Sequence, residues 1–203
     1  MKLYSSPVAP SPRKVLIFIA EKVITDIEVK NLDIGKLEHK TPEYKKIAPN
    51  SRIPALVLDN GEVILETTAI CRYLECFHPE PNLFGNNADE IAQIEMWYSR
   101  ISFELMMPLM HGFRHTHPHM SELENQNNEF GLAQRELAVK SLKYYDEIMA
   151  DDKEYIACNK FSYADIQAVI SLQFLVRLNK IDMNDYKNLS NYINNIANRP
   201  SFA

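Results

Sequence analysis

The apolar positions of this chain follow two periods, and the change between them divides the sequence in two. Up to about residue 77, short alternating or apolar runs typical of strands are separated by stretches with helical spacing. The first strand covers 1–5, a second lies around Ile27 and Val29, and the clearest helix covers 13–23. A weakly helical stretch follows over 41–47. The pattern predicts the order strand, helix, strand, helix, strand, strand, helix.

Beyond about residue 88 the alternation disappears and only helical spacing remains. It predicts four helices, over 88–114, 122–149, 162–176 and 185–198. Ser162, followed three residues later by Asp165, matches a capping box at the start of the third helix. We therefore expect a second part that is entirely helical.

These two parts predict an α/β domain followed by an all-α domain. A β-α-β pair with a hairpin and a covering helix forms a compact layer, which we assign to 1–77. Pro79 and Pro81 break the preceding helix and mark a connection over 78–87. The all-α domain then covers 88–203.

A proline corner precedes the third strand, where Pro54 is followed by Ala55-Leu56-Val57-Leu58. Proline cannot donate a ladder hydrogen bond, and the peptide bond before it is one of the few that can be cis. The backbone N–H and C=O of Ile53 are then free to pair with an extended ligand, as an added strand would. The corner therefore predicts a peptide-binding surface.

A second binding element follows the hairpin. Asp59-Asn60-Gly61 turns the chain into a strand over 62–65, and Glu66-Thr67 opens a helix. The first N–H groups of a helix and its positive dipole end suit a ligand carboxylate, while the Glu66 carboxylate can accept a ligand ammonium. We expect the ligand to carry a free amino-acid end.

These residues resemble the cytosolic glutathione transferase family, whose amino-terminal half is thioredoxin-like. The resemblance covers nearly the whole chain, from the first strand through Phe161-Ser162-Tyr163-Ala164-Asp165 to Arg199-Pro200-Ser201-Phe202. The run from Glu38 to Tyr44 is similar to bacterial and fungal transferases that lack the usual catalytic tyrosine, serine or cysteine. The resemblance implies that glutathione is bound and its sulfur held as thiolate, the nucleophilic form.

The usual catalytic hydroxyl is absent from this chain. In many relatives a serine precedes a proline four residues before the Arg-Lys-Val equivalent, and alignment on Arg13-Lys14-Val15 places Ala9 there. Ser11 is the closest remaining hydroxyl and our candidate for the thiol contact. Ser11-Pro12 reads equally well as an N-cap and first helical residue, a structural role.

In the resembled subgroup, a water held by the first helix of the second domain takes the role of the missing side chain. His111 and His115 are four residues apart in that region, so they share a helix face. We choose His115 as the catalytic candidate. The alternative is that these histidines are partly exposed polar residues at a helix end without a catalytic role. Four histidines between 111 and 119 suggest a metal site, but Pro118 interrupts the local geometry, and no metal is predicted.

The resemblance assigns the remaining contacts. Lys40 and Arg52 are expected near the glycine carboxylate of glutathione, although both can also be ordinary surface charges. With Ile53, Pro54, Glu66 and Thr67 they complete the predicted glutathione-binding set. We expect an apolar pocket for the electrophile at Met106, Met107, Met110 and Phe113. The alternative is that most of these residues belong to the core.

The composition limits which partners and which cellular location we expect. The chain has 203 residues, 46% of them hydrophobic, and a formal net charge of -5. This charge, without a long run of Lys or Arg, argues against nucleic acid and anionic membranes as partners. The lack of a membrane-length apolar run and of a signal-peptide core predicts a soluble cytoplasmic protein. Three cysteines without CxxC or zinc spacing are expected to be reduced.

We expect a homodimeric enzyme that conjugates glutathione to a small electrophile or uses it to reduce a peroxidic substrate. One alternative is a non-catalytic relative that binds a protein partner, which the loss of a hydroxyl at Ala9 favours and the presence of Glu66-Thr67 opposes. Another is glutathione-dependent disulfide exchange. It requires a cysteine at the start of the first helix, and the sequence has none there.

Overall fold

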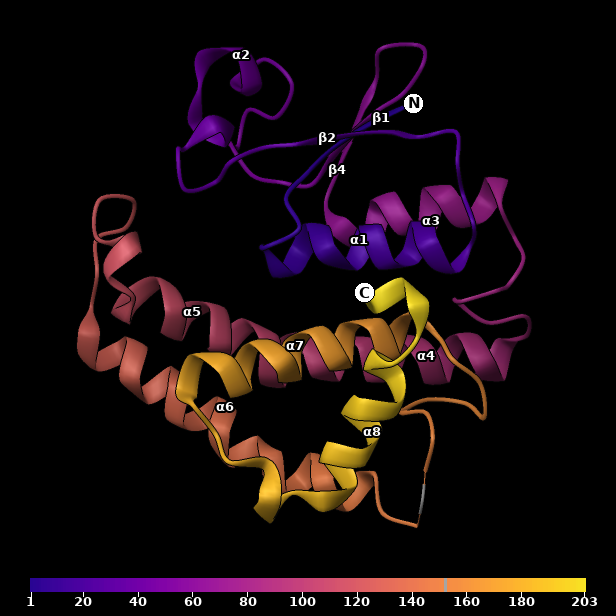
Figure 1. The fold of residues 1–203 in the computed structure, drawn as a ribbon, viewed down its shortest axis with the longest axis vertical. Coiled ribbons are helices and arrows are strands. Elements are labelled where there is room, and N and C mark those ends of the chain that lie inside the picture. Colours follow the sequence, from indigo (N-terminus) through magenta and orange to yellow (C-terminus); the bar gives the residue numbers. More distant parts are fainter. Residues whose placement is uncertain (152) are drawn as a thin grey trace. The chain divides into compact units, whose positions relative to one another are not determined.

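The structure is a computed structural model that describes residues 1–151 and 153–203. The chain forms two compact units, Met1–Leu83 and Phe84–Ala203. Each unit has its own helices, and the strands belong to the first unit (Figure 1). The exact limits of a connection over 78–87 stay a prediction.

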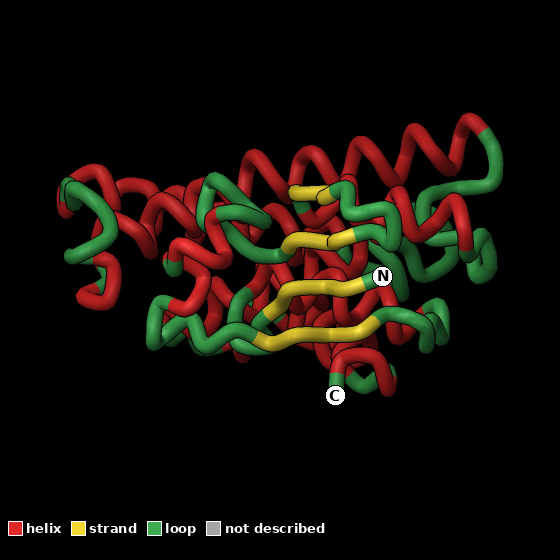
Figure 2. Tube along the Cα trace, turned by 90° about the horizontal axis from the view of Figure 1, so that it is seen from above, coloured by secondary structure: helices red, strands yellow, loops and turns green. Residues whose placement is uncertain are grey.

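The first unit contains a mixed four-stranded sheet with the strand order β2-β1-β3-β4 (Figure 2). Strands β1 and β2 are parallel, whereas β3 is antiparallel to both β1 and β4. This confirms the predicted thioredoxin-like order of elements. The elements are β1 (Lys2–Ser5), α1 (Pro10–Glu21), β2 (Glu28–Asn31), η1 (Glu38–Lys40), α2 (Pro42–Lys45), β3 (Ala55–Val57), β4 (Val63–Leu65) and α3 (Thr67–Phe77).

Helices α1 and α3 pack side by side on one face of the sheet (Figure 1). Val15 and Phe18 of α1 and Ile70 and Leu74 of α3 are fully buried, as are the sheet residues Leu3 and Leu56. Burial of such side chains stabilises the unit by about 1.5–3 kcal/mol for each large one. The opposite face carries Tyr4, whose ring lies 5.6 Å from that of Tyr44 in α2. Strand β2 is an edge strand, and all four of its residues are exposed.

Helix α1 begins earlier than predicted, at Pro10, and its N-cap is Ala9. The interpretation of Ser11 as the N-cap is therefore wrong. Proline fits the first position of a helix because its φ is already helical and its missing N–H is not needed there. The residue before a proline avoids the helical region, and Ala9 is accordingly extended, with φ -95° and ψ 136°.

The second unit is helical in the residues that the structure describes, which confirms the predicted all-α part. Helix α6 starts six residues later than the predicted 122, because the Asn127 side chain accepts the Phe130 N–H and fixes the first turn there. The long elements are α4 (Ala88–Arg100), η2 (Ile101–Met106), α5 (Met107–Thr116), α6 (Asn128–Ile148), α7 (Tyr163–Asn179) and α8 (Lys187–Ala197). Three short 3₁₀ turns, η3 (Pro118–Met120), η4 (Met183–Asp185) and η5 (Pro200–Phe202), complete it.

The predicted helix over 88–114 is interrupted by the π-helical segment η2, which joins α4 to α5. Its wider turn is seen where the Met107 N–H donates to the Ser102 carbonyl, five residues earlier. Pro108 follows directly, and a proline ring cannot be accommodated in a regular helix interior without displacing the preceding turn. The proline gives a physical reason for the π segment.

The start of α7 has the predicted capping box. The Asp165 carboxylate accepts the Ser162 N–H at 2.9 Å and the Ile156 N–H at 2.8 Å. It also accepts the Tyr192 hydroxyl at 2.9 Å, which ties α8 to the start of α7. Burial raises the pKa of Asp165, while these donors act in the opposite direction.

The cysteines at 71, 76 and 158 are free, and Cys71 is fully buried in α3, as expected for a packing residue. Within residues 1–151 and 153–203, no helix is long and apolar enough to cross a lipid bilayer.

Candidate functional site

Three segments of the first unit meet at one end of its strands, where β1 and β4 stop and β3 begins. This end is here called the edge of the sheet. Tyr4 near the end of β1 pairs with Ala55 at the start of β3, and Ala55 pairs with Leu65 at the end of β4. The loop after β1, the Ile53-Pro54 corner and the Glu66-Thr67 junction therefore lie at the same edge. The Ile53-Pro54 bond is cis, and Ile53 lies outside the β3 ladder. The structure thus brings together the predicted Ile53, Pro54, Glu66 and Thr67.

Glu66 has an unusual backbone at the start of α3. Its φ is 70° and its ψ 126°, and its side chain does not cap the helix. A non-glycine residue with positive φ costs of order 1–3 kcal/mol, and such residues concentrate at functional sites. The exposed Glu66 side chain and the uncapped first turn of α3 leave both an acceptor and backbone donors for a ligand.

The proline corner is held from the α2 side. The Tyr44 hydroxyl donates to the Arg52 carbonyl at 2.8 Å, and the Arg52 N–H donates to the Asn50 side chain at 3.1 Å. Tyr44 is buried, which raises the pKa of its hydroxyl and keeps it a donor. The Arg52 backbone is therefore fixed while its side chain stays exposed.

Lys40 ends the 3₁₀ turn η1, and its backbone N–H donates to the Leu37 carbonyl at 2.7 Å. The turn also presents His39, which the sequence reasoning missed. His39 Nδ1 is buried and has no hydrogen-bond partner within the described residues. Burial, reinforced by Lys40, lowers the pKa of His39. The signal that could have found it is its place beside Lys40, directly before the Thr41-Pro42 helix start.

Ser11 is the second residue of α1, and its side chain is half-buried. Of the first three residues of α1, only Ser11 has a backbone N–H, because the other two are Pro10 and Pro12. The Ala9 N–H before them donates to the Ser6 carbonyl at 3.3 Å. The donors that the first turn offers to a ligand therefore come from Ser11, one from its backbone and one from its hydroxyl.

His115 lies in α5 of the second unit. As predicted, His111 and His115 share a helix face, and both rings contact Phe130 of α6, with ring centroids 5.7 and 5.1 Å away. His115 Nδ1 accepts the Asn127 backbone N–H at 3.0 Å. In the neutral ring the proton is then on Nε2, so that atom is a donor.

The neighbouring histidines have local partners. His117 Nδ1 accepts the His119 N–H at 3.3 Å and caps η3. Burial lowers the pKa of His117, and His119 and Arg135 lower it further. Within the described residues, no group of three or more His, Cys, Asp or Glu side chains has the arrangement of a metal site.

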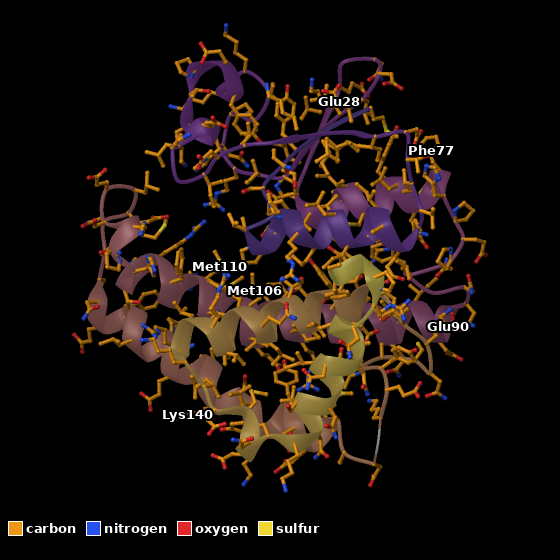
Figure 3. The ribbon with its side chains drawn as sticks, in the orientation of Figure 1. Glu28, Phe77, Glu90, Met106, Met110 and Lys140 are labelled. Atoms are coloured by element: carbon orange, nitrogen blue, oxygen red, sulfur yellow. The ribbon has the colours of Figure 1, made fainter. Side chains whose placement is uncertain are left out.

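The apolar residues considered for the electrophile divide between two environments. Met106 of η2 is buried and Met107 is 43% exposed, while Met110 of α5 is half-buried (Figure 3). Phe113 packs edge-on against Phe174 of α7, with ring centroids 5.6 Å apart. Only part of this set is therefore buried.

Comparison with known proteins decides the family. Residues 8–76 match the model of the glutathione S-transferase N-terminal domain, and residues 97–200 match that of its C-terminal domain. The chain is also 34% identical over 177 residues to glutathione S-transferase 2 of Saccharomyces cerevisiae, covering 86% of this chain and 76% of that protein. This chain belongs to the cytosolic glutathione S-transferase family.

Solved glutathione S-transferases share the whole fold. The crystal structure of Gtt2 from S. cerevisiae has a TM-score of 0.90 and 32% identity, covering 100% of this chain and 98% of that one. A glutathione S-transferase domain-containing protein from Marinobacter aquaeolei has a TM-score of 0.91 and 32% identity, covering both chains completely. A class Gtt2 glutathione S-transferase of Vibrio parahaemolyticus has a TM-score of 0.85 and 29% identity, covering 100% and 95%.

In this glutathione S-transferase, the residue before α1 is Ala9. The N-cap of α1 has no hydroxyl, and the first-turn donors are on Ser11 instead.

Proposed function

We propose that this protein is a glutathione transferase that binds glutathione at the edge formed by Ile53-Pro54 and Glu66-Thr67. It stabilises the thiolate and conjugates it to small electrophiles or uses it to reduce peroxides. The observation that carries the proposal is the convergence of these two segments with the uncapped start of α1 at one edge of the sheet.

Each part of the tripeptide has a candidate partner. Groups of opposite charge face its two ends, and backbone groups face its central residue. Glu66 accepts the γ-glutamyl ammonium, and the Thr67 end of α3 donates to the adjacent carboxylate. The Ile53 backbone pairs with the cysteinyl residue as an added strand. Lys40 and Arg52 bind the glycine carboxylate, and His39, whose Nδ1 is buried beside Lys40, joins them.

Ser11 is the proposed activating residue. Lowering a thiol pKa from about 8.5 to about 6.5 requires roughly 2.7 kcal/mol of preferential thiolate stabilisation. A hydroxyl and a backbone N–H at the positive end of α1 are donors of the required kind. Because Pro10 and Pro12 contribute none, the contribution of the first turn of α1 depends on a single residue.

His115 is proposed as a second catalytic residue that acts through a bound water molecule, as the resemblance implies for the first helix of its domain. Since Nδ1 accepts the Asn127 N–H, Nε2–H donates to this water and the ring is not the base. The Phe130 contact and the Asn127 bond fix the ring orientation.

A glutathione titration followed by two assays tests the proposal. Calorimetry is expected to give saturable binding below about 1 mM, and turnover with a generic aryl halide or with cumene hydroperoxide separates conjugation from reduction. The S-methyl derivative of glutathione is the control, because it keeps the peptide contacts and removes the thiol. No binding at millimolar glutathione overturns the proposal.

The alternative is a non-catalytic relative that binds a protein partner, and Ala9 in place of the usual hydroxyl favours it. It predicts glutathione binding without turnover of any electrophile or peroxide. Measurement of the thiolate absorbance of bound glutathione distinguishes the two, because only a transferase needs to lower the thiol pKa.

We further propose a cytoplasmic homodimer. Exposed apolar side chains such as Met96 of α4 and Met107 of α5, 42% and 43% exposed, are compatible with an additional contact surface. Light scattering coupled to size exclusion is expected to give twice the 23.5 kDa mass of one chain.

A further inference from the structure

The first unit has a cavity at the end of the sheet opposite the proposed glutathione site. Leu58 and Asp59 follow β3, and β3 ends where Val57 pairs with Lys2 at the start of β1. Helix α3 also leads there: its 11 residues carry the chain about 16 Å from Glu66 to Phe77. The cavity has a volume of about 430 Å³, in the range of small-molecule sites. The described residues that line it belong to the first unit, namely Met1, Asp26, Leu58, Asp59, Asn60, Tyr73, Phe77 and His78.

One wall of this cavity is aromatic. Tyr73 and Phe77 are one helical turn apart on α3, with ring centroids 4.9 Å apart and planes inclined by 46°. Phe77 lies at the end of α3 and is 64% exposed, unusual for so large an apolar side chain (Figure 3). The π-face of such a ring attracts cations.

The charges around the cavity are mainly negative. The Asp59 carboxylate accepts the Met1 ammonium at 2.7 Å, so these two groups neutralise each other. Asp26 is exposed and has no cationic partner among the described residues. The carbonyl end of α3 adds a partial negative charge, and its last turn contains no basic residue.

Lys22, which contacts the end of α3 behind this wall, is itself paired. Lys22 Nζ donates to the His78 carbonyl at 2.7 Å and forms an ion pair with Glu75 at 2.7 Å. Lys22 is buried, and its ion pair with Glu75 neutralises its charge. Lys22 therefore adds no net positive charge at the cavity. The uncompensated charge at the cavity is therefore that of Asp26.

We infer that this cavity binds a small organic cation with an apolar body, such as an arylalkyl ammonium compound. The ammonium pairs with Asp26 and lies over the Tyr73–Phe77 rings, and the apolar body contacts Leu58. Neither contact uses a residue of the proposed glutathione site, so this inference is independent of the transferase activity.

The test is a titration of the full chain with phenethylammonium and benzyltrimethylammonium, followed by calorimetry and by backbone amide NMR. We expect saturable binding that weakens with salt, with shifts confined to residues near Asp26, Asn60 and 73–78. The neutral 2-phenylethanol and the anionic phenylacetate are the matched probes, and both are expected to bind at least ten-fold more weakly. No saturation by 10 mM cation, or equal binding of the three charge types, overturns the inference.

Two exposed substitutions localise the site without removing core residues. Phe77→Ala and Asp26→Asn are each expected to weaken cation binding about three-fold, in line with exposed cation–π and ion-pair contacts. Phe103→Ala and Asp185→Asn, equally exposed positions in the second unit, are the controls and are expected to leave it unchanged. Wild-type affinity in both cavity variants, or a loss in the controls, contradicts the assignment.

Discussion

The first turns of α1 and α7 are built in opposite ways. At α7, Asp165 is completely buried and accepts hydrogen bonds from Ser162, Ile156 and Tyr192. At α1, the N-cap is Ala9, no side chain caps the turn, and Ser11 has the only N–H of the first three helical residues. Helix α3 resembles α1, since its N-cap Glu66 makes no side-chain cap.

This difference separates a structural helix start from one that is available to a ligand. Free first-turn N–H groups cost stability unless something accepts from them. Where the chain supplies the acceptor, as at α7, the turn contributes to folding alone. Where the chain omits it, as at α1 and α3, a carboxylate or thiolate can take that place.

The largest expected effect is on stability, from Asp165→Ala. The substitution leaves the Ser162 and Ile156 N–H groups and the Tyr192 hydroxyl without an acceptor in a buried site, so the free energy of unfolding should fall by about 3–5 kcal/mol. Urea denaturation measures it. Asp182→Ala is the control, because Asp182 caps an exposed 3₁₀ turn through the Asn184 N–H, and its loss should be below about 1 kcal/mol. A loss as small as the control's would mean that α7 does not depend on its cap.

Glu66→Gly should affect binding and stability in opposite directions. Loss of the carboxylate should weaken glutathione binding about 10- to 100-fold, as expected for a charge-assisted hydrogen bond. Glycine tolerates the φ of 70°, so the free energy of unfolding should stay constant or rise by up to about 1 kcal/mol.

The matched control for Glu66→Gly is Lys180→Gly. Lys180 has a φ of 52° at the end of α7, so glycine relieves a similar conformation there without touching the glutathione site. Calorimetry with glutathione should then show wild-type affinity. Unchanged affinity in the Glu66 variant instead would remove Glu66 from the site.

Ser11→Ala should impair activity with little effect on folding. Loss of the hydroxyl donor should raise the pKa of bound glutathione by about one unit and lower kcat/KM near neutral pH about ten-fold. Because Ser11 is not the N-cap, the free energy of unfolding should change by less than about 0.5 kcal/mol. The pH profile of the conjugation rate reports the thiol pKa, and Ser11→Thr should restore it. A profile that does not move assigns activation to other groups.

Ala9→Ser should produce the smallest change. It is the sharpest test of the difference between the uncapped start of α1 and the capped start of α7. An N-cap hydroxyl accepts from the second or third helical N–H, and since Pro12 has none, the new serine must use that of Ser11. We expect a gain of about 0.5–1 kcal/mol in stability and a smaller thiolate fraction, measured by ultraviolet absorbance of bound glutathione. A larger thiolate fraction would show that residue 9 faces the sulfur.

The sequence predicted the structure correctly where a local pattern allows one structural interpretation. The spacing of Ser162 and Asp165 predicted the cap of α7, whereas it is the structure that shows the Pro54 and Glu66-Thr67 segments at one edge of the sheet. The start of α1 was misjudged because Pro10 and Pro12 both suit a first helical turn, and spacing alone does not choose between them. His39 was missed because nothing in the sequence indicates that its Nδ1 is buried without a hydrogen-bond partner among the described residues.

The π-helical turn between α4 and α5 fixes the rotational phase of everything after it. One extra residue in a helix turns the following side chains by about 100° relative to those before. Deleting a single residue within 101–106 would therefore leave the helix intact and yet swing Met110 and His115 away from their present directions. In this fold, the orientation of the second half of a long helix is encoded by how many residues precede Pro108.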